Sequence, residues 1–123
     1  MIAMVSEVAV QSGYVAFLDA LRACGFEGEI APDYANRTVL ATDNSIYQRL
    51  PQAAVFPKHA EDLERLAKLA AELPHRDIVL TPRGGGTGTN GQSLTDGIVV
   101  DVSRHMNQII EIDVEARRVR VQA

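Results

Sequence analysis

Cysteine is nearly absent from this chain of 123 residues, and its scarcity excludes several kinds of protein. The single Cys24 can form neither an internal disulfide nor a cysteine-cluster metal site, which agrees with a reducing compartment. No apolar run approaches the roughly 20 residues of a membrane span, and residues 1–10 lack the basic start and long apolar core of a signal peptide. We therefore expect a cytoplasmic protein without a membrane span.

Basic clusters are also missing from the sequence. The net charge is −4 and aromatic residues make up 5% of the chain, so binding to nucleic acid has no support. The three histidines, His59, His75 and His105, are scattered without ligand spacing, and the sequence predicts no metal site. No general base or nucleophile stands out, so no catalytic residue is predicted.

The most specific feature of the chain is the run Arg-Gly-Gly-Gly-Thr-Gly-Thr-Asn-Gly at residues 83–91. Five glycines in these nine residues let the backbone adopt positive φ repeatedly and turn its N–H groups into one concavity. Thr87, Thr89 and Asn90 add side-chain donors. An apolar strand candidate at 78–81 precedes the run and is closed by Pro82, so the loop follows a buried strand, where ligands collect in α/β folds. The pattern predicts a cradle for a diphosphate.

The residues after the loop restrict which diphosphate it binds. A nucleoside triphosphatase loop needs Lys followed by Ser or Thr, whereas Gln92 and Ser93 follow here. The dinucleotide-binding spacing G-x-G-x-x-G is formed by Gly86, Gly88 and Gly91. That motif must open a helix, but residues 92–97 are turn-rich and lead into a strand. A flexible glycine-rich linker is the alternative interpretation, although linkers seldom join two apolar strands.

These segments resemble FAD-linked oxidases and dehydrogenases of the vanillyl-alcohol oxidase and p-cresol methylhydroxylase (PCMH) superfamily. The resemblance rests on Thr81 to Gly91, Ile98 to Ser103 with Met106-Asn107, Ala54 to Pro57, and Thr42 to Tyr47. It covers residues 34–123 in order. The sequence is most similar to the large bacterial FAD-linked dehydrogenases of D-2-hydroxy acids, D-2-hydroxyglutarate among them, which carry an iron-sulfur module at the far C-terminus.

The resemblance implies an α+β fold. We expect the first subdomain of a PCMH-type FAD-binding domain, in which a small parallel β-α-β core with flanking helices precedes the start of an antiparallel subdomain. Residues 1–50 would form an N-terminal helix and an irregular lead-in. Residues 51–123 would be the N-terminal part of the FAD-binding domain, incomplete at its C-terminus because the family's domain is longer than this chain.

The resemblance also implies a function. It implies noncovalent FAD and an oxidoreductase that oxidises a 2-hydroxy acid by hydride transfer to flavin, with the base downstream and any iron-sulfur cluster outside these residues. This chain alone would be inactive and would self-associate through an open sheet edge. The expected cofactor-binding residues are Pro82, Arg83, Gly84, Gly85, Gly86, Thr87, Gly88, Thr89, Asn90 and Gly91. Two alternatives stay open: a non-catalytic nucleotide- or phosphate-binding module, and an interaction module in which the loop is structural.

Local patterns predict most of the regular structure. The expected helices are 13–24, capped by Ser12 and ended by Gly25, and 59–73, with an apolar stripe of Leu63, Leu66, Ala67, Ala70 and Leu73. The expected strands are 53–56, 78–81 and 98–102, of which the first two should be parallel, followed by a hairpin of 108–113 and 117–122. Residues 26–44 show no period and predict an irregular connection, and 45–50 predict one helical turn.

Four side chains have more than one interpretation. Asp101, inside an apolar strand, should brace the loop by accepting hydrogen bonds from its backbone or from Ser103, and a direct contact with the ligand is the less favoured alternative. Arg83 either approaches the phosphates or pairs with an acid such as Asp101. Tyr47 either approaches the cofactor or only packs in a turn. Cys24 is either a small buried hydrophobe or a nucleophile, and the first is expected near the end of a helix.

Overall fold

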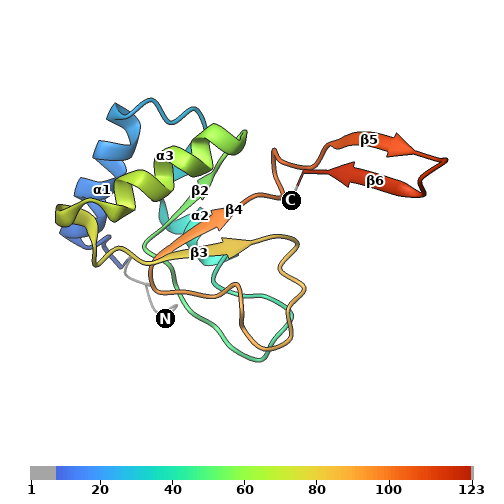
Figure 1. The fold of residues 1–123 in the computed structure, drawn as a ribbon. Coiled ribbons are helices and arrows are strands. Elements are labelled where there is room, and N and C mark those ends of the chain that lie inside the picture. Colours follow the sequence, from blue (N-terminus) through green and yellow to red (C-terminus); the bar gives the residue numbers. More distant parts are fainter. Residues whose placement is uncertain (1–7, 123) are drawn as a thin grey trace.

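A four-stranded sheet forms the centre of the molecule (Figure 1). The computed structural model describes residues 8–122, so the first seven residues of the expected lead-in and Ala123 lie outside the described residues. The strands lie in the order β1 (Glu29–Ala31), β2 (Ala53–Phe56), β4 (Ile98–Asp101) and β3 (Leu80–Arg83). β2 and β3 both run parallel to β4, and β1 pairs antiparallel with β2. The α+β class and the parallel direction of β2 and β3 are confirmed, with β4 inserted between them.

The two central strands are buried along their whole length. Their side chains alternate between two apolar clusters, one on each face of the sheet. Ala53, Val55, Ile98 and Val100 join the larger cluster, and Ala54, Phe56 and Val99 join the smaller one. Burial on both faces explains why these strands read as continuous apolar runs instead of alternating ones.

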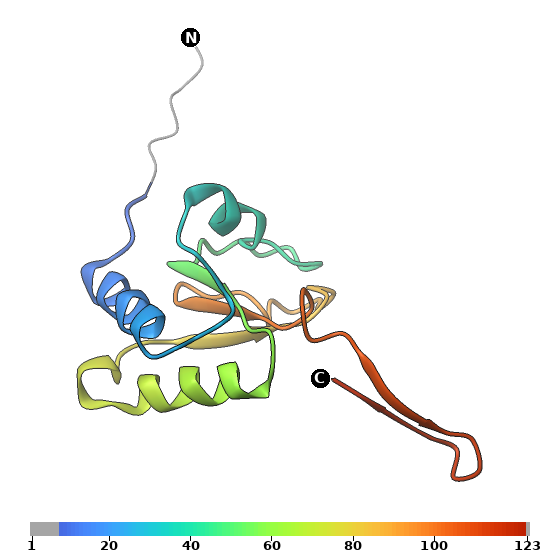
Figure 2. The same cartoon turned by 90° about the horizontal axis from the view of Figure 1, so that it is seen from above.

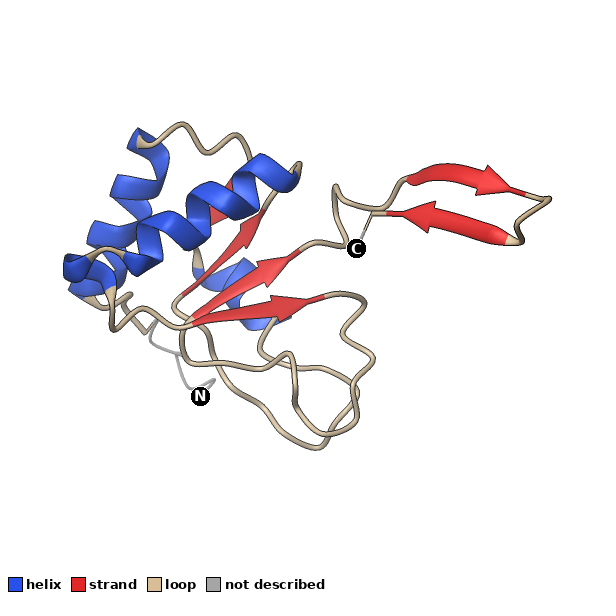
Figure 3. Cartoon of the chain, viewed as in Figure 1, coloured by secondary structure: helices blue, strands red, loops and turns tan. Residues whose placement is uncertain are grey.

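Three helices cover the two faces of this sheet (Figures 2 and 3). α1 (Ser12–Ala23) and α3 (Ala60–Ala71) lie side by side on one face, and the short α2 (Tyr34–Val39) lies on the other. A 3₁₀ turn, η1 (Leu73–His75), follows α3. Within residues 8–122, no helix has both the length and the apolar character needed to cross a bilayer.

The helix boundaries differ in detail from expectation. Ser12 is the first residue of α1 and does not cap it, while Gly25 takes φ 84° just after the helix, as expected of a helix end. Cys24 is exposed, because it lies at the C-terminal cap, where its thiol contacts the Leu21 carbonyl. Leu73 is 76% exposed, because α3 ends before it and η1 turns it away from the core.

The expectation for residues 26–50 is wrong. The expected irregular connection contains β1 and α2, of three and six residues, which are too short for a periodic apolar pattern. Asp33 caps α2 by accepting a hydrogen bond from the Asn36 N–H at 3.0 Å. The expected helical turn at 45–50 is instead a tight turn closed by a bridge between Thr42 and Gln48.

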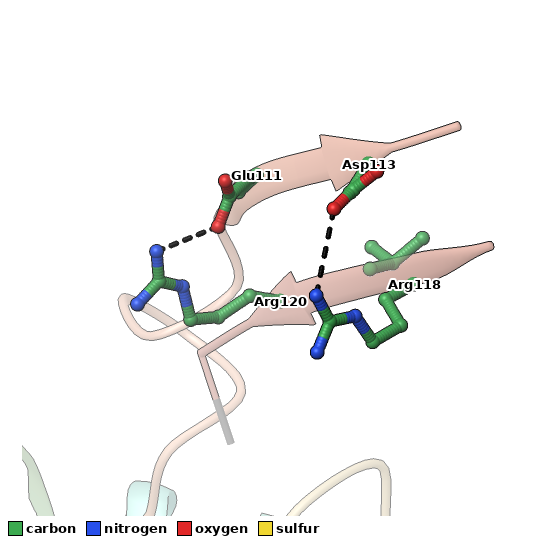
Figure 4. A pocket seen from close by; sticks show the side chains of 5 residues that line it. Glu111, Asp113, Arg118 and Arg120 are labelled. Carbon is green, nitrogen blue, oxygen red and sulfur yellow. Dashed lines mark hydrogen bonds and ion pairs between the residues drawn. The ribbon is translucent and has the colours of Figure 1, made fainter. Parts of the chain in front are cut away.

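The expected C-terminal hairpin is confirmed and extends away from the sheet (Figure 1). It consists of β5 (Ile109–Asp113) and β6 (Arg118–Val121), with an irregularity between Ile109 and Glu111. One face carries the ion pairs Glu111–Arg120 at 2.6 Å and Asp113–Arg118 at 3.6 Å around an open hollow of about 310 Å³ (Figure 4). The register places four aliphatic side chains on the other face, all more than half exposed: Ile109, Ile112, Val119 and Val121.

A buried carboxylate connects the helical layer to the loops around it. Asp62, in the first turn of α3, is 0% exposed, and its two oxygens accept hydrogen bonds from the N–H groups of Glu27 at 2.9 Å and Lys58 at 3.0 Å. Arg65 adds a contact at 3.3 Å. Burial raises the pKa of the Asp62 carboxyl, but these hydrogen bonds and the neighbouring His59 outweigh it and hold the pKa below its ordinary value.

We expect Asp62→Asn to lower the free energy of unfolding by about 1 to 3 kcal/mol, because the amide nitrogen cannot accept and would face a buried N–H donor. Since the folded pKa of Asp62 is lowered, its contribution is present above the unfolded value of 3.8 and is lost as the pH falls through the folded value. Denaturant unfolding of the full-length protein between pH 3 and 7 measures both effects. Asp19→Asn on the exposed side of α1 is the matched control and should change little. Equal stability of the two variants would contradict the prediction.

Candidate functional site

The glycine-rich loop leaves the C-terminal end of β3 and returns to the start of β4 (Figure 1). Residues 84–97 contain no helix, as the sequence predicted. Of the five glycines, Gly86 and Gly91 take positive φ, at 66° and 75°. The loop therefore lies at the edge of the sheet where the parallel strands end, which is where α/β proteins bind ligands.

The first half of the loop borders an open hollow of about 360 Å³. Six of the ten expected site residues line it: Pro82, Gly84, Gly85, Gly86, Thr87 and Gly88. Gln92 and Ser93 complete the lining and were missed by the sequence analysis, although both directly follow the predicted run. Asn90 and Gly91 line a neighbouring hollow of about 310 Å³ with Tyr47, Gln48, Arg49 and Leu94.

The loop offers backbone donors around the first hollow. Among the described residues, no protein acceptor takes a hydrogen bond from the N–H groups of residues 84–89. The next N–H, of Asn90, donates to the Gln92 side chain at 3.1 Å. Several consecutive unengaged N–H groups in a glycine-rich turn form a concavity that attracts anions.

Side chains at the glycine positions would disturb this arrangement in different ways. A Cβ on Gly86 would overlap the Arg83 guanidinium, and a Cβ on Gly88 would overlap the Gln92 amide oxygen. At Gly84 a Cβ would meet nothing within 4 Å, so a side chain there would project into open space without strain. A substitution at Gly84 therefore tests whether the hollow must stay empty, without straining the backbone.

Arg83 contacts other parts of the protein beside the hollow. Its guanidinium donates to the Thr42 carbonyl at 2.9 Å and lies 3.4 Å from the Ser93 hydroxyl. It makes no ion pair with Asp101, so Asp101 is the wrong partner, and the acid that its charge influences is Asp43. Asp101 instead accepts from the N–H and hydroxyl of Ser103 at 2.8 and 2.6 Å, which confirms Ser103 as its partner.

A second segment, the turn 42–48, lies beside the glycine loop in both ribbon views (Figures 1 and 2). The Asn44 N–H donates to the Gly86 carbonyl at 3.1 Å. Asp43 accepts from the Ser45 N–H at 2.8 Å and lies 3.4 Å from the Ser93 hydroxyl. An acid followed two residues later by Ser is typical of such a turn and is the signal that could have located it. The Tyr47 ring is 59% exposed.

The charges around the loop are balanced by the protein itself. The hydrogen bond from Ser45 is the main cause that holds the pKa of the Asp43 carboxyl below its ordinary value, against burial, and the Ser93 hydroxyl and Arg83 charge act in the same direction. At the outer rim Arg49 pairs with Asp96 at 3.1 Å. Across residues 8–122, no three His, Cys, Asp or Glu side chains gather closely enough to hold a metal ion. The arrangement suits an anion held by backbone dipoles.

Among known families, the one described as FAD binding domain matches residues 51–123. The D-2-hydroxyglutarate dehydrogenase of Pseudomonas putida is 68% identical over 123 residues, which are 100% of this chain and 12% of that protein. The enzyme of that name from Escherichia coli is 55% identical over 107 residues, which are 87% of this chain and 10% of that protein. The chain thus spans a small part of these relatives.

Solved structures share the fold. Alkyldihydroxyacetonephosphate synthase superposes with a TM-score of 0.74 at 22% identity, over 94% of this chain and 25% of that one. p-Cresol methylhydroxylase with substrate bound gives 0.63 at 18% identity, over 85% of this chain and 21% of that one. At these identities the likeness concerns the fold alone, and it agrees with the PCMH-type architecture expected from the sequence.

Proposed function

This chain belongs to the FAD binding domain family, and on that premise we propose that its glycine-rich loop holds the diphosphate of noncovalently bound FAD. The observation that carries the proposal is the set of unengaged N–H groups at residues 84–88, which line the 360 Å³ hollow. The space is of the size of small-ligand sites, and its donors suit an anionic group. We also propose that residues 51–123 are the N-terminal part of the FAD-binding domain and that 1–50 lead into it.

The expected site residues have distinct roles in this proposal. Pro82 forms part of the wall, Arg83 supports the loop from behind, and the backbone from Gly84 to Gly88 donates to phosphate oxygens. The hydroxyls of Thr87 and Thr89 and the Asn90 amide add donors, while Gly91 turns the chain at positive φ. Dipoles that point at the phosphates stabilise their charge without a metal ion.

For the complete protein we propose the oxidation of a 2-hydroxy acid, with D-2-hydroxyglutarate as the first candidate. The 68% identity to an enzyme of that name over the whole of this chain supports the proposal. When bound, FAD supplies the hydride acceptor for such a reaction. The carboxylate beside the loop, Asp43, is already engaged by Ser45 and Ser93, so in this proposal the described residues bind and orient the cofactor. Residues elsewhere in the complete protein bind the substrate and supply the base, and the protein acts in the cytoplasm.

The full-length protein should therefore purify with FAD, and anaerobic addition of D-2-hydroxyglutarate should bleach the flavin absorbance band. The L enantiomer, added at the same concentration, is the control and should leave the band unchanged. If FAD is present but no D-2-hydroxy acid reduces it, the assignment of a dehydrogenase is wrong and a non-catalytic binding module is favoured. Absence of FAD would contradict the cofactor proposal itself.

Glycine substitutions in the full-length protein test the hollow. We expect Gly84→Val to lower FAD affinity more than tenfold, because its side chain occupies phosphate space, and to change the unfolding free energy by less than about 0.5 kcal/mol. Gly86→Val should abolish FAD retention and also cost about 1 to 3 kcal/mol of stability, because φ is positive there. Gly88→Val should also lose FAD.

The matched control is Gly13→Val, at an exposed position in α1 where a Cβ meets nothing within 4 Å. It should retain FAD fully. Flavin titration of the apo proteins and thermal unfolding give both quantities. Full flavin occupancy in Gly84→Val would show that the hollow does not hold the diphosphate.

A polypeptide of residues 1–123 alone should bind FAD weakly and self-associate, because the aliphatic face of the hairpin is exposed and β6 has an open edge. Ile112→Lys with Val119→Glu should restore the monomer in light scattering. The control, Glu111→Lys with Arg120→Glu, alters only the charged face and should still associate. A monomeric polypeptide that binds FAD tightly would contradict the prediction.

A further inference from the structure

The glycine loop is held by a small polar cluster behind it, which consists of Arg83, Ser93 and Asp43 and is called the polar clamp below. We propose that the polar clamp presets the loop for the diphosphate and that Arg83 is a positioning residue, not a phosphate ligand. The inference rests on the proposed function, since it assigns to these side chains the preorganisation of the same site.

Arg83 has protein acceptors for its charge. One terminal nitrogen donates to the Thr42 carbonyl at 2.9 Å, and the other lies 3.4 Å from the hydroxyl of Ser93, a residue that is 9% exposed. The guanidinium also occupies the space next to Gly86, where a Cβ would overlap it. The planar guanidinium therefore contacts Thr42 and Ser93 at once and lies against Gly86, which suits the role of a fixed support for the loop.

Asp43 completes the polar clamp from the side of the turn 42–48. One carboxylate oxygen accepts from the Ser45 N–H at 2.8 Å and the other lies 3.4 Å from the Ser93 hydroxyl. The adjacent Asn44 N–H donates to the Gly86 carbonyl at 3.1 Å. The Ser93 hydroxyl therefore lies between the Asp43 carboxylate and the Arg83 guanidinium. The loop and the turn are joined both by these side chains and by the backbone hydrogen bond from Asn44 to Gly86.

Little else holds the first half of the loop. Within the described residues, the bond from Asn44 to Gly86 is the one backbone hydrogen bond that joins residues 84–89 to the rest of the protein. Glycine-rich segments lose much conformational entropy when they are ordered. A loop that is already ordered in the apo protein binds FAD more tightly, because no further conformational entropy is lost when FAD binds. The polar clamp is positioned to supply this order.

The test uses the full-length apo protein, FAD titration and limited trypsin digestion followed by mass spectrometry. Trypsin cuts after Arg83, so the rate of cleavage between Arg83 and Gly84 reports how firmly the polar clamp holds. The variants are Asp43→Asn, Ser93→Ala and their combination. Asp96→Asn is the matched control, because this acid lies in the same loop connection but pairs with the exposed Arg49.

Both single variants should weaken FAD binding roughly tenfold, the usual effect of losing a hydrogen bond to a charged group, and should speed cleavage at Arg83. Their combination should cost less than the product of the two effects, because they share one cluster. Saturating FAD should restore the wild-type flavin spectrum, and thermal unfolding should remain near wild type. The control should match the wild type throughout. Unchanged affinity and cleavage in both single variants would overturn the proposal.

Arg83→Lys separates positioning from direct contact. If the charge acts only on the phosphates, Arg83→Lys should leave the rate of trypsin cleavage after residue 83 in the apo protein unchanged; if Arg83 holds Thr42 and Ser93 together, that rate should rise, because one ammonium cannot replace the fork. An unchanged cleavage rate in Arg83→Lys would therefore refute the positioning role. If the wild-type protein does not bind FAD, the proposed function is wrong. If Gly84→Val loses FAD while the polar clamp variants bind it normally, the proposed function stands and only the role of the polar clamp is wrong.

Discussion

The parallel pairing of β3 with β4 is the constraint on which the site depends. Parallel neighbouring strands begin at the same end of a sheet. The chain that leaves the end of β3 must therefore return over the full length of the strands before β4 begins. Here it does so without a helix. Residues 84–91 remain at the far edge, where 84–88 line the hollow, and the return ends at Gly97, where a Cβ would overlap the Val79 carbonyl. The close backbone packing at Gly97 lies at the start of β4, so the residues that form the binding loop lie at the opposite edge of the sheet.

The N-terminal third of the chain belongs to the same structure as the loop. β1 pairs with β2, and α1 packs with α3 on the larger apolar cluster. The buried Arg37 of α2 donates to the carbonyls of Val8 at 2.6 Å and Pro51 at 2.7 Å, which ties both ends of this region to the start of β2. The turn 42–48, which meets the glycine loop, lies in the chain between Arg37 and Pro51 and so between two residues that the second of these hydrogen bonds joins. Support for the site therefore comes from residues far from it in sequence.

The sequence predicted what depends on long apolar runs or on unusual composition. β2, β4, the hairpin and the helix-free glycine loop were recognised because burial on two faces, alternation and glycine content each leave a local pattern. β1, α2 and the turn 42–48 were missed, because each is held by partners distant in the chain. Arg83 shows the same limit: composition placed it beside the loop, but its partners Thr42 and Ser93 are known only from the fold. Cys24 and Leu73 were misjudged because small shifts of helix ends decide their exposure.

The loop can account for only part of a cofactor as large as FAD. Residues 84, 85, 87, 89 and 90 are exposed, and the hollow is open, so these donors can balance the charge of a diphosphate but cannot bury a flavin ring. Tight sites usually enclose most of the ligand surface with apolar side chains. The aliphatic face of the hairpin is uncovered but extends away from the loop (Figure 1), and in the turn 42–48 beside the loop Ile46 is 94% exposed. Among the described residues, recognition of the diphosphate charge is therefore better provided for than apolar enclosure of a flavin ring.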